Sequence, residues 1–296
     1  MFEDASREFA EAVREATDGS IEIELYNTQE FIAGRGGEVV TRTELCECLA
    51  KGEIEMAHTY VSALGSLHNK LWAIELPFLF RDYDHADRVF ESKIAEQYMS
   101  DMIPSGVRGL CFAYSGGYRI IPSKGHAIRS AADFEGLRIR TSGNPVPGAL
   151  FERLGATAVP GPLENIGPWT EQNKIDAAEL TYVRFLSTGL EKYCDTVNET
   201  FHSMFTTMMV INERFFRSLT DKQQAAIADA GRAAGRIERQ KALDEEKKIK
   251  ALCPYKGVEV VEMSEEARDE IREVALGVYE QFTPQFGEDL VEALRA

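Results

Sequence analysis

A strand followed directly by a helix, over residues 136–160, most constrains the fold of this chain. The sequence there is GLRIRTSGNPVPGALFERLGATAVP. Residues Leu137–Arg140 alternate apolar and basic side chains, which is typical of a strand with one buried face. Asn144 can cap a helix that starts at Pro145, and apolar residues then recur at helical spacing. The pattern therefore predicts Arg140 at the carboxyl end of a strand, beside a helix amino terminus.

That position suits the capture of an anion, because ligands of open α/β sheets bind at the carboxyl ends of strands. The Arg140 guanidinium, the Thr141 and Ser142 hydroxyls and backbone N–H groups at the helix start would together suit a carboxylate. Spacing alone equally allows an ordinary surface arginine at the end of a strand. It does not decide between these two interpretations.

Further segments make the chain similar to one protein family. They are FAEAVREATDGSIEIELY, LAKGEIEMA, ELPFLFRDYDHADRVF and VINERFFRSLTDKQQAAI. Together with residues 136–160, and in the same order, they resemble the solute-binding proteins of TRAP (tripartite ATP-independent periplasmic) transporters. That family has a Gly-Leu-Lys-Ile-Arg-Val strand at this place, followed by a helix that ends in Leu-Gly-Ala. The resemblance covers most of the chain.

The resemblance implies which residues contact ligand. The family arginine that grips the substrate carboxylate falls on Arg140, and a second, frequently ligand-facing arginine falls on Arg119. Both would lie in a cleft and not in the core, so the protein should fold without either. The other expected ligand-binding residues are Thr141, Ser142 and Asn144 beside Arg140, with Tyr60, Leu163, Leu180 and Phe205 shaping the rest of the pocket.

After Pro162 the chain departs from the family pattern. The family has a regular helix with a tyrosine here, whereas this chain has Gly167 near that position and Pro168, which should kink or delay the helix. Leu180 replaces an asparagine that often contacts ligand. Because leucine neither donates nor accepts hydrogen bonds, we expect an apolar or aromatic ligand body behind the carboxylate. Trp169 faces either the pocket or the core, and we favour the core.

Strands that alternate with helices predict an α/β fold. The resemblance implies two lobes of the periplasmic-binding-protein type, with a ligand cleft between them that closes by hinge motion and a long helix spanning both. We expect lobe I over residues 1–117 and 206–250, and lobe II over residues 118–205 and 251–296. Gly116 and Gly117 would lie where the chain crosses between lobes, as a hinge or simply as a β-bulge.

Periodicity predicts several elements away from the site. Residues 2–16 should form a helix whose buried stripe ends at Ala16, and residues 21–25 a half-exposed strand. A second helix should cover residues 39–50. His85 is expected in a solvated helix, and the acidic tail is expected to form a single amphipathic helix.

Composition and charge exclude several function classes. The chain has 296 residues, of which 44% are hydrophobic, and this is enough for a substantial core. The formal net charge of −16 argues against nucleic acid or anionic membranes as partners. No run of about eighteen apolar residues is present, so we expect no direct membrane insertion. The 5 cysteines follow neither a metal-ligand nor a disulfide pattern, and no cofactor or metal is expected.

The sequence offers no arrangement typical of an enzyme, such as a nucleophile with its base, paired acids or metal ligands. His58 has no partner at a suitable spacing, which favours a hydrogen-bonded histidine over a base or metal ligand. The resemblance implies an extracytoplasmic receptor that binds a small organic carboxylate and delivers it to TRAP membrane subunits. A sensory or regulatory ligand-binding module of the same fold remains the alternative.

The amino terminus differs from what the resemblance implies. Family members have an export signal, a first strand and a loop before the helix at residues 2–16, and none of these is found in this sequence. A shortened form of a periplasmic protein is our preferred interpretation, and a cytoplasmic protein is the rival interpretation.

Overall fold

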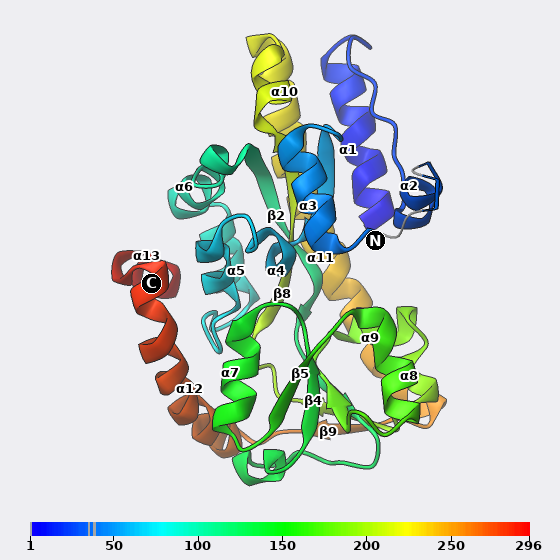
Figure 1. Ribbon diagram of the computed structural model, residues 1–296, viewed down its shortest axis with the longest axis vertical. Coiled ribbons are helices and arrows are strands. Elements are labelled where there is room, and N and C mark those ends of the chain that lie inside the picture. Colours follow the sequence, from blue (N-terminus) through cyan, green and yellow to red (C-terminus); the bar gives the residue numbers. More distant parts are fainter. Residues whose placement is uncertain (1, 35, 38–39) are drawn as a thin grey trace. The chain divides into compact units, whose positions relative to one another are not determined.

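The structure of the protein is a computed structural model that describes residues 2–34, 36–37 and 40–296. It contains both helices and strands (Figure 1). The chain divides into two compact units, each built from three segments. Unit 1 comprises Met1–His68, Phe90–Ala113 and Thr207–Lys241, and unit 2 comprises Asn69–Val89, Tyr114–Thr206 and Ala242–Ala296.

These bounds differ from the expected lobes mainly at residues 69–89, which we placed in lobe I and which belong to unit 2. The 3₁₀ helix η1 (Asn69–Glu75) packs against α12 (Glu265–Phe286), and Glu75 forms an ion pair with Arg119. Both contacts tie the segment to unit 2.

Unit 1 contains a sheet in the order β1–β8–β2, with β1 antiparallel to β8. Two of these strands, β2 and β8, continue into unit 2, and so does the long helix α11. The elements of unit 1 are α1 (Phe2–Ala16), α2 (Thr28–Gly34), α3 (Arg42–Lys51), β1 (Met56–Tyr60), α4 (Val61–Leu64), α6 (Lys93–Ser100), η2 (Ile103–Ser105) and α10 (Glu213–Ser218), with parts of β2 (Val107–Tyr118), β8 (Met204–Asn212) and α11 (Asp221–Leu252).

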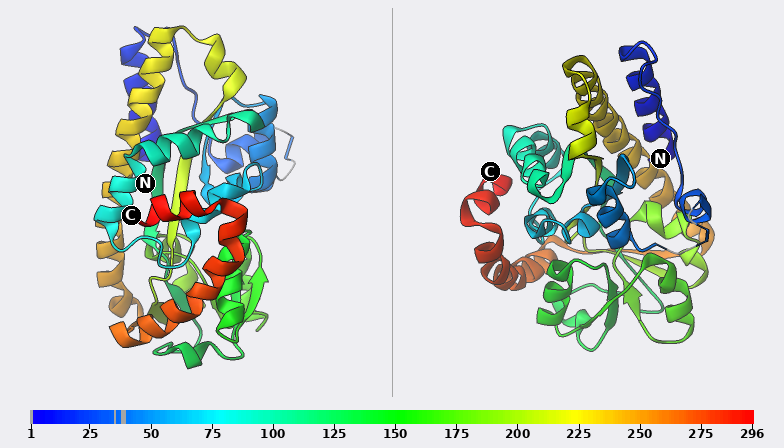
Figure 2. Two further views of the ribbon diagram at one scale, coloured as in Figure 1. Left: turned by 90° about the vertical axis from the view of Figure 1, so that its left-hand side faces the viewer. Right: turned by 45° about the horizontal axis from the view of Figure 1, so that its top comes forward.

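The core of unit 1 joins α1 to α11, which run side by side in Figure 2. Phe9 and Val13 of α1 pack with Leu110 of β2 and Ile227 of α11. The predicted end of the buried stripe was wrong, because Ala16 is exposed.

Two predicted elements next to this core differ from the structure. Residues 21–25 do not form a strand: Ile21 and Ile23 pack on the core through their side chains, but the segment has no strand pairing in the structure. The helix predicted over residues 39–50 begins at Arg42, where Thr41 and Glu44 form a capping box. Its predicted first residue, Val39, lies outside the described residues.

Unit 2 is built on a sheet in the order β5–β4–β6–β3–β7–β9. β4 is parallel to both β5 and β6, β7 is parallel to β9, and β3 is antiparallel to its neighbours. The elements are α5 (Tyr83–Phe90), β3 (Ile121–Ser123), η3 (Ala131–Phe134), β4 (Arg138–Thr141), α7 (Pro145–Arg153), β5 (Thr157–Pro160), η4 (Leu163–Asn165), α8 (Ile166–Glu171), β6 (Ala177–Ala178), α9 (Tyr182–Ser187), η5 (Leu190–Lys192), β7 (Thr196–Glu199), η6 (Cys253–Lys256), β9 (Glu259–Glu262), α12 and α13 (Glu288–Arg295), besides η1.

The tail and the α5 region correct two further predictions. The tail forms two helices, because Gly287 adopts a φ of 101° between α12 and α13. His85 of α5 is buried, and its Nδ1 accepts a hydrogen bond from the Arg81 N–H. The α5 helix therefore packs His85 inward and does not expose it to solvent.

The glycine pair of β2 has left-handed backbone angles, with φ of 92° at Gly116 and 83° at Gly117. A Cβ atom on Gly117 would come within 2.2 Å of the Tyr83 hydroxyl, and one on Gly116 within 2.5 Å of Thr181 Oγ1. Both backbone angle and close packing therefore require glycine here. A hinge role for the pair stays a prediction.

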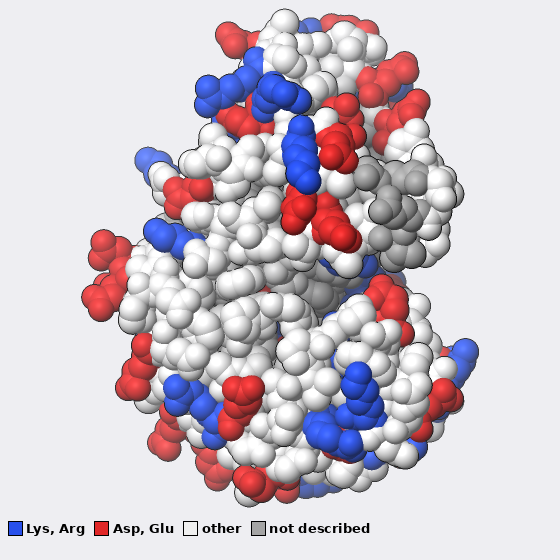
Figure 3. Space-filling model, in the orientation of Figure 1, with Lys and Arg blue, Asp and Glu red and all other residues white. Residues whose placement is uncertain are grey.

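Charged side chains of both signs are interspersed on the face drawn in Figure 3. The net charge of −16 is therefore not gathered into one patch on that face. None of the helices that the structure describes is long and apolar enough to cross a membrane.

Candidate functional site

The predicted strand and helix meet as expected around Arg140. β4 lies between two parallel neighbours, with Arg140 opposite Val159 of β5 on one side and Ala178 of β6 on the other. Asn144 caps α7, and its Oδ1 accepts a hydrogen bond of 2.9 Å from the Val146 N–H. Arg140 thus lies near the carboxyl end of a central strand, and a three-residue loop leads from there to a helix amino terminus.

Backbone carbonyls orient the Arg140 guanidinium. Its Nε donates to the Gly161 carbonyl at 2.7 Å, and its Nη1 donates to the Glu179 carbonyl at 3.4 Å. The residue is 6% exposed. These bonds fix the guanidinium at the end of β4 through neutral acceptors.

Arg119 has a different environment, and this corrects our expectation that it lies outside the core. It is 0% exposed. Its Nη2 lies 3.2 Å from Glu75 Oε2 and its Nη1 lies 3.6 Å from Glu179 Oε2. The guanidinium also stacks over the Phe205 ring, 4.0 Å from the centroid. Two carboxylates and an aromatic face therefore surround this charge inside unit 2.

The pKa values of the two glutamates around Arg119 are shifted in opposite directions. Burial raises the pKa of Glu75 above its ordinary value, and the nearby Arg119 charge offsets this only in part. Burial also opposes ionisation of Glu179, but the Arg119 charge, the nearby His202 ring and the hydrogen bond from the Ser142 N–H outweigh it and lower the pKa to about 2. Glu179 is therefore the partner of Arg119 whose ionised form is stabilised, whereas burial works against ionisation of Glu75.

The same two glutamates hold the loop between β4 and α7. Glu179 Oε1 accepts a 2.8 Å hydrogen bond from the Ser142 N–H, and Glu75 Oε2 accepts one of 2.8 Å from the Asn144 side chain. Sequence reasoning gave neither glutamate a role in the site. The available signal was a glutamate at the start of the apolar run ELPFLF.

His202 completes this buried cluster. Its Nε2 lies 3.6 Å from Glu179 Oε2, and its Nδ1 lies 2.8 Å from Thr200 Oγ1. Burial lowers the pKa of His202, which favours the neutral ring. No sequence pattern singled out this histidine, because its partners come from distant parts of the chain.

The other predicted site residues are only partly brought together. Thr141, Ser142 and Asn144 are buried beside Arg140, and Phe205 lies beneath Arg119. Leu180 is 1% exposed and pairs through its backbone with Ile120. The remaining two are Leu163, which is half-buried in η4, and Tyr60, which belongs to unit 1 and has the Arg42 guanidinium 4.5 Å above its ring.

The departures near α8 are accommodated locally. Pro168 lies in the first turn of α8, where its missing N–H would have had no partner within the helix. The helix starts only at Ile166, after the 3₁₀ turn η4, which agrees with the predicted delay. A Cβ on Gly167 would lie 2.8 Å from the Tyr193 ring. Tyr193 therefore takes up the space that a side chain at Gly167 would need.

Residues weighed for chemistry have structural partners. The His58 Nε2 lies 2.9 Å from Thr207 Oγ1, as expected for a hydrogen-bonded histidine. All 5 cysteines are free and buried, and burial raises the pKa of Cys111 to about 12. Within residues 2–34, 36–37 and 40–296, no group of three His, Cys, Asp or Glu side chains could hold a metal ion.

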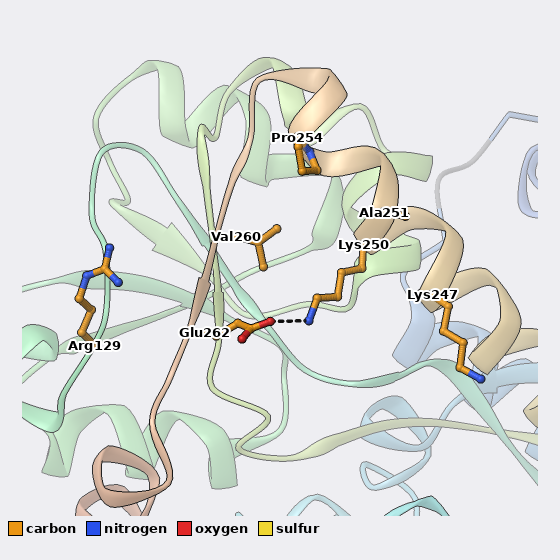
Figure 4. A pocket seen from close by; sticks show the side chains of 7 residues that line it. All are labelled: Arg129, Lys247, Lys250, Ala251, Pro254, Val260 and Glu262. Atoms are coloured by element: carbon orange, nitrogen blue, oxygen red, sulfur yellow. Dashed lines mark hydrogen bonds and ion pairs between the residues drawn. The ribbon is translucent and has the colours of Figure 1, made fainter.

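A hollow in unit 2 lies beside η6 and β9 and has a volume of about 670 Å³ (Figure 4). Lys250 on its wall pairs with Glu262 at 3.1 Å and with Glu199 at 2.9 Å. Lys247 and Arg129 add further positive charge to its lining (Figure 4). None of the predicted ligand-binding residues lines it.

Comparison with known proteins identifies the family. The family of bacterial extracellular solute-binding proteins, family 7 (DctP), matches residues 1–285. The chain belongs to this family. The predicted TRAP solute-binding resemblance and the two-lobed α/β class are confirmed.

Known proteins that are similar to this chain in sequence or structure are solute-binding proteins too. The 2,3-diketo-L-gulonate-binding periplasmic protein YiaO of Escherichia coli is 25% identical over 87% of this solute-binding protein and 76% of its own length. A TRAP periplasmic solute-binding protein from Ochrobactrum anthropi, with its C terminus bound in the ligand-binding pocket, has a TM-score of 0.87 and 26% identity over 98% of this chain and 88% of that one. One from Roseobacter denitrificans, with bound β-D-glucuronate, has a TM-score of 0.88 and 22% identity over 99% and 94%.

Proposed function

We propose that this family-7 protein is a periplasmic receptor that binds a small organic carboxylate and delivers it to TRAP membrane subunits. The position of Arg140 carries the proposal, because carbonyl contacts fix its guanidinium at the end of β4, beside the capped start of α7. Arg140 would hold the carboxylate as a two-pronged hydrogen-bonded pair. No chemical conversion of the ligand is part of this role.

Groups next to Arg140 support an anionic ligand. The Ser142 hydroxyl is buried and has no hydrogen-bond partner in the described part of the chain. With Thr141 it would supply donors to the second carboxylate oxygen. The amino terminus of α7, a helix of 9 residues, adds partial positive charge.

We further propose that an apolar or aromatic body follows the ligand carboxylate. Leu180, Leu163 and Phe205 are the apolar residues assigned to the pocket, and the Tyr193 ring takes the space beside Gly167. A hydroxyl-rich sugar acid would leave some of its polar groups unpaired against such a wall. The glucuronate bound by the Roseobacter denitrificans protein makes sugar acids the essential comparison.

The first experiment identifies the ligand. Mass spectrometry of small molecules released from gently denatured protein is followed by a thermal-shift panel of mono- and dicarboxylates, aromatic acids and sugar acids. We expect stabilisation by acids with an apolar body. Exclusive stabilisation by a sugar acid such as D-glucuronate would contradict this selectivity, and no stabilisation by any carboxylate would contradict the receptor proposal.

The second experiment tests Arg140 itself by calorimetric titration with the most stabilising acid of that panel. Arg140→Ala should cost on the order of 2–5 kcal/mol, which is roughly thirty-fold to several-thousand-fold in Kd, because the ligand charge is left unpaired. Arg140→Lys should restore binding only in part, since a point charge cannot reproduce the two-pronged geometry.

Arg138 provides the matched control, because it lies on the same strand and pairs with Asp176 at 2.6 Å. Arg138→Ala removes an arginine of β4 whose charge is already matched by a carboxylate of the protein. We expect its Kd to stay within about threefold of the original. Unchanged affinity in a folded Arg140→Ala protein would remove the basis of the proposal.

A further inference from the structure

Gly161, which directly follows β5, lies between the end of β4 and the Arg140 side chain. Its N–H donates to the Thr141 carbonyl at 3.1 Å, and its own carbonyl accepts the Arg140 Nε at 2.7 Å. The position of Gly161 therefore sets where the Arg140 Nε finds an acceptor.

Gly161 is packed so closely that no side chain fits. A Cβ atom there would lie 2.2 Å from Trp169 Cη2 and 2.5 Å from Trp169 Cζ3. The φ of Gly161 is outside the left-handed region, so its backbone conformation does not itself require glycine. The requirement comes from the indole ring of Trp169, which rests directly on the Gly161 backbone.

Trp169 is itself held in place from the chain that follows α8. The Lys174 ammonium lies 3.8 Å from the centroid of the indole, and the Lys174 N–H donates to the Trp169 carbonyl at 2.8 Å. A cation so close to an indole ring contributes a specific attraction. The order of contacts is thus Lys174 to Trp169, Trp169 to Gly161 and Gly161 to Arg140.

We propose that Trp169 is a positioning residue for ligand binding, which holds the Gly161 carbonyl where it orients the Arg140 guanidinium. Trp169 need not touch the ligand for this role. The proposal rests on the proposed function insofar as Arg140 holds the ligand carboxylate. This role accounts for the contact of the Trp169 ring with Gly161 and for the half-buried position of Trp169.

The test uses a double-mutant cycle. Gly161→Ala should push the indole and the Gly161 peptide apart and raise Kd by about 5- to 100-fold, and Trp169→Ala should raise it by a smaller factor. In the double variant, Trp169→Ala removes the ring that the new methyl group strikes. We therefore expect Gly161→Ala to change Kd by at most about twofold when it is introduced into the Trp169→Ala variant.

A readout without ligand separates this proposal from the proposed function. The Arg140 Nε–H signal can be assigned by nuclear magnetic resonance from its loss in Arg140→Lys. Because its hydrogen bond to Gly161 slows exchange with water, we expect faster exchange in Gly161→Ala and in Trp169→Ala, with exchange slowed again in the double variant relative to Gly161→Ala.

Gly34→Ala is the matched control, because a Cβ there would meet nothing within 4 Å. It should change neither the exchange rate nor Kd for the most stabilising acid of the panel. If the exchange rate of Arg140 Nε–H is the same in Gly161→Ala, Trp169→Ala and the original protein, the positioning role is wrong. If exchange responds as expected but Arg140→Ala leaves Kd unchanged, the positioning of Arg140 stands and the proposed carboxylate site fails.

Discussion

Arg119 and Arg140 lie in the same unit and are almost equally buried, at 0% and 6% exposed, yet their surroundings differ. Arg119 contacts two buried carboxyl groups and an aromatic face, whereas the Arg140 contacts described above are with neutral carbonyl oxygens. Burying a charge is costly unless a counter-charge accompanies it. Arg119 therefore has its counter-charge within the protein. Burial alone does not distinguish the two arginines, whereas the buried carboxyl groups of Glu75 and Glu179 at Arg119 do.

The largest expected effect separates the two arginines by stability. Arg119→Met should lower the free energy of unfolding by about 3–5 kcal/mol, because it leaves the Glu179 carboxylate buried and unpaired. Arg140→Met should lower it by less, since the hydrogen bonds that Arg140 donates to the Gly161 and Glu179 carbonyls are each worth about 1 kcal/mol and join no buried carboxylate. Urea denaturation of both ligand-free variants measures this difference. Equal losses would contradict the contrast between the two sites.

The pH dependence of stability sharpens the role of Glu179. Its pKa is about 2 in the folded protein against an ordinary value of 4.5, so its contribution is fully present above about pH 4.5 and is lost as the pH falls toward 2. The contribution is on the order of 3 kcal/mol. Glu179→Gln should remove this acid dependence and destabilise the protein near neutral pH. Denaturation midpoints measured from about pH 2 to about pH 7 test it, and an unaltered pH profile in the variant would refute the assignment.

Glu75 should behave in the opposite sense. Because burial raises its pKa, the neutral form is favoured in the folded protein, and the stability it contributes is lost as the pH rises through the folded pKa. Glu75→Gln imitates the neutral form and keeps an acceptor for Asn144. We expect this variant to be as stable as the original protein or more stable at about pH 8, where Glu179→Gln is less stable. Equal destabilisation by both substitutions would show that the two carboxyl groups carry the same charge.

The strand that carries Arg140 and the capped helix beside it could be predicted from sequence, because strand alternation and the Asn144 cap are local patterns, but the Gly161 and Glu179 carbonyls that Arg140 contacts could not. The partners of Arg119 could not be predicted, because Glu75 and Glu179 approach from distant segments and only the folded sheet brings them together. The wrong strand at residues 21–25 has a related cause. Alternation showed which side chains face the core, but strand pairing depends on a partner that periodicity does not reveal.

The boundaries of helices and of the two units could likewise be predicted from sequence only where they depend on neighbouring residues. The long helix that the resemblance implies is found as α11, and Thr220 and Gln223, three residues apart, exchange hydrogen bonds at its start. The break of the tail at Gly287 was missed because a single glycine is also tolerated within helices. The assignment of residues 69–89 to unit 2 depends on contacts with Arg119 and α12, which no local pattern contains.

The smallest expected effect concerns Phe205, which we assigned to the ligand pocket and which lies 4.0 Å from the Arg119 guanidinium. If its main role is to cover that charge, Phe205→Leu should cost about 1–2 kcal/mol of stability through the lost cation–π contact and the smaller side chain. Part of this cost, about 0.5–2 kcal/mol, should vanish in the Arg119→Met background. Affinity for the most stabilising acid should then change by less than about twofold. The opposite result would be additive effects of Phe205→Leu and Arg119→Met on the free energy of unfolding, together with a tenfold loss of affinity in Phe205→Leu. It would place Phe205 against the ligand and show that Arg119 does not depend on this ring for cover.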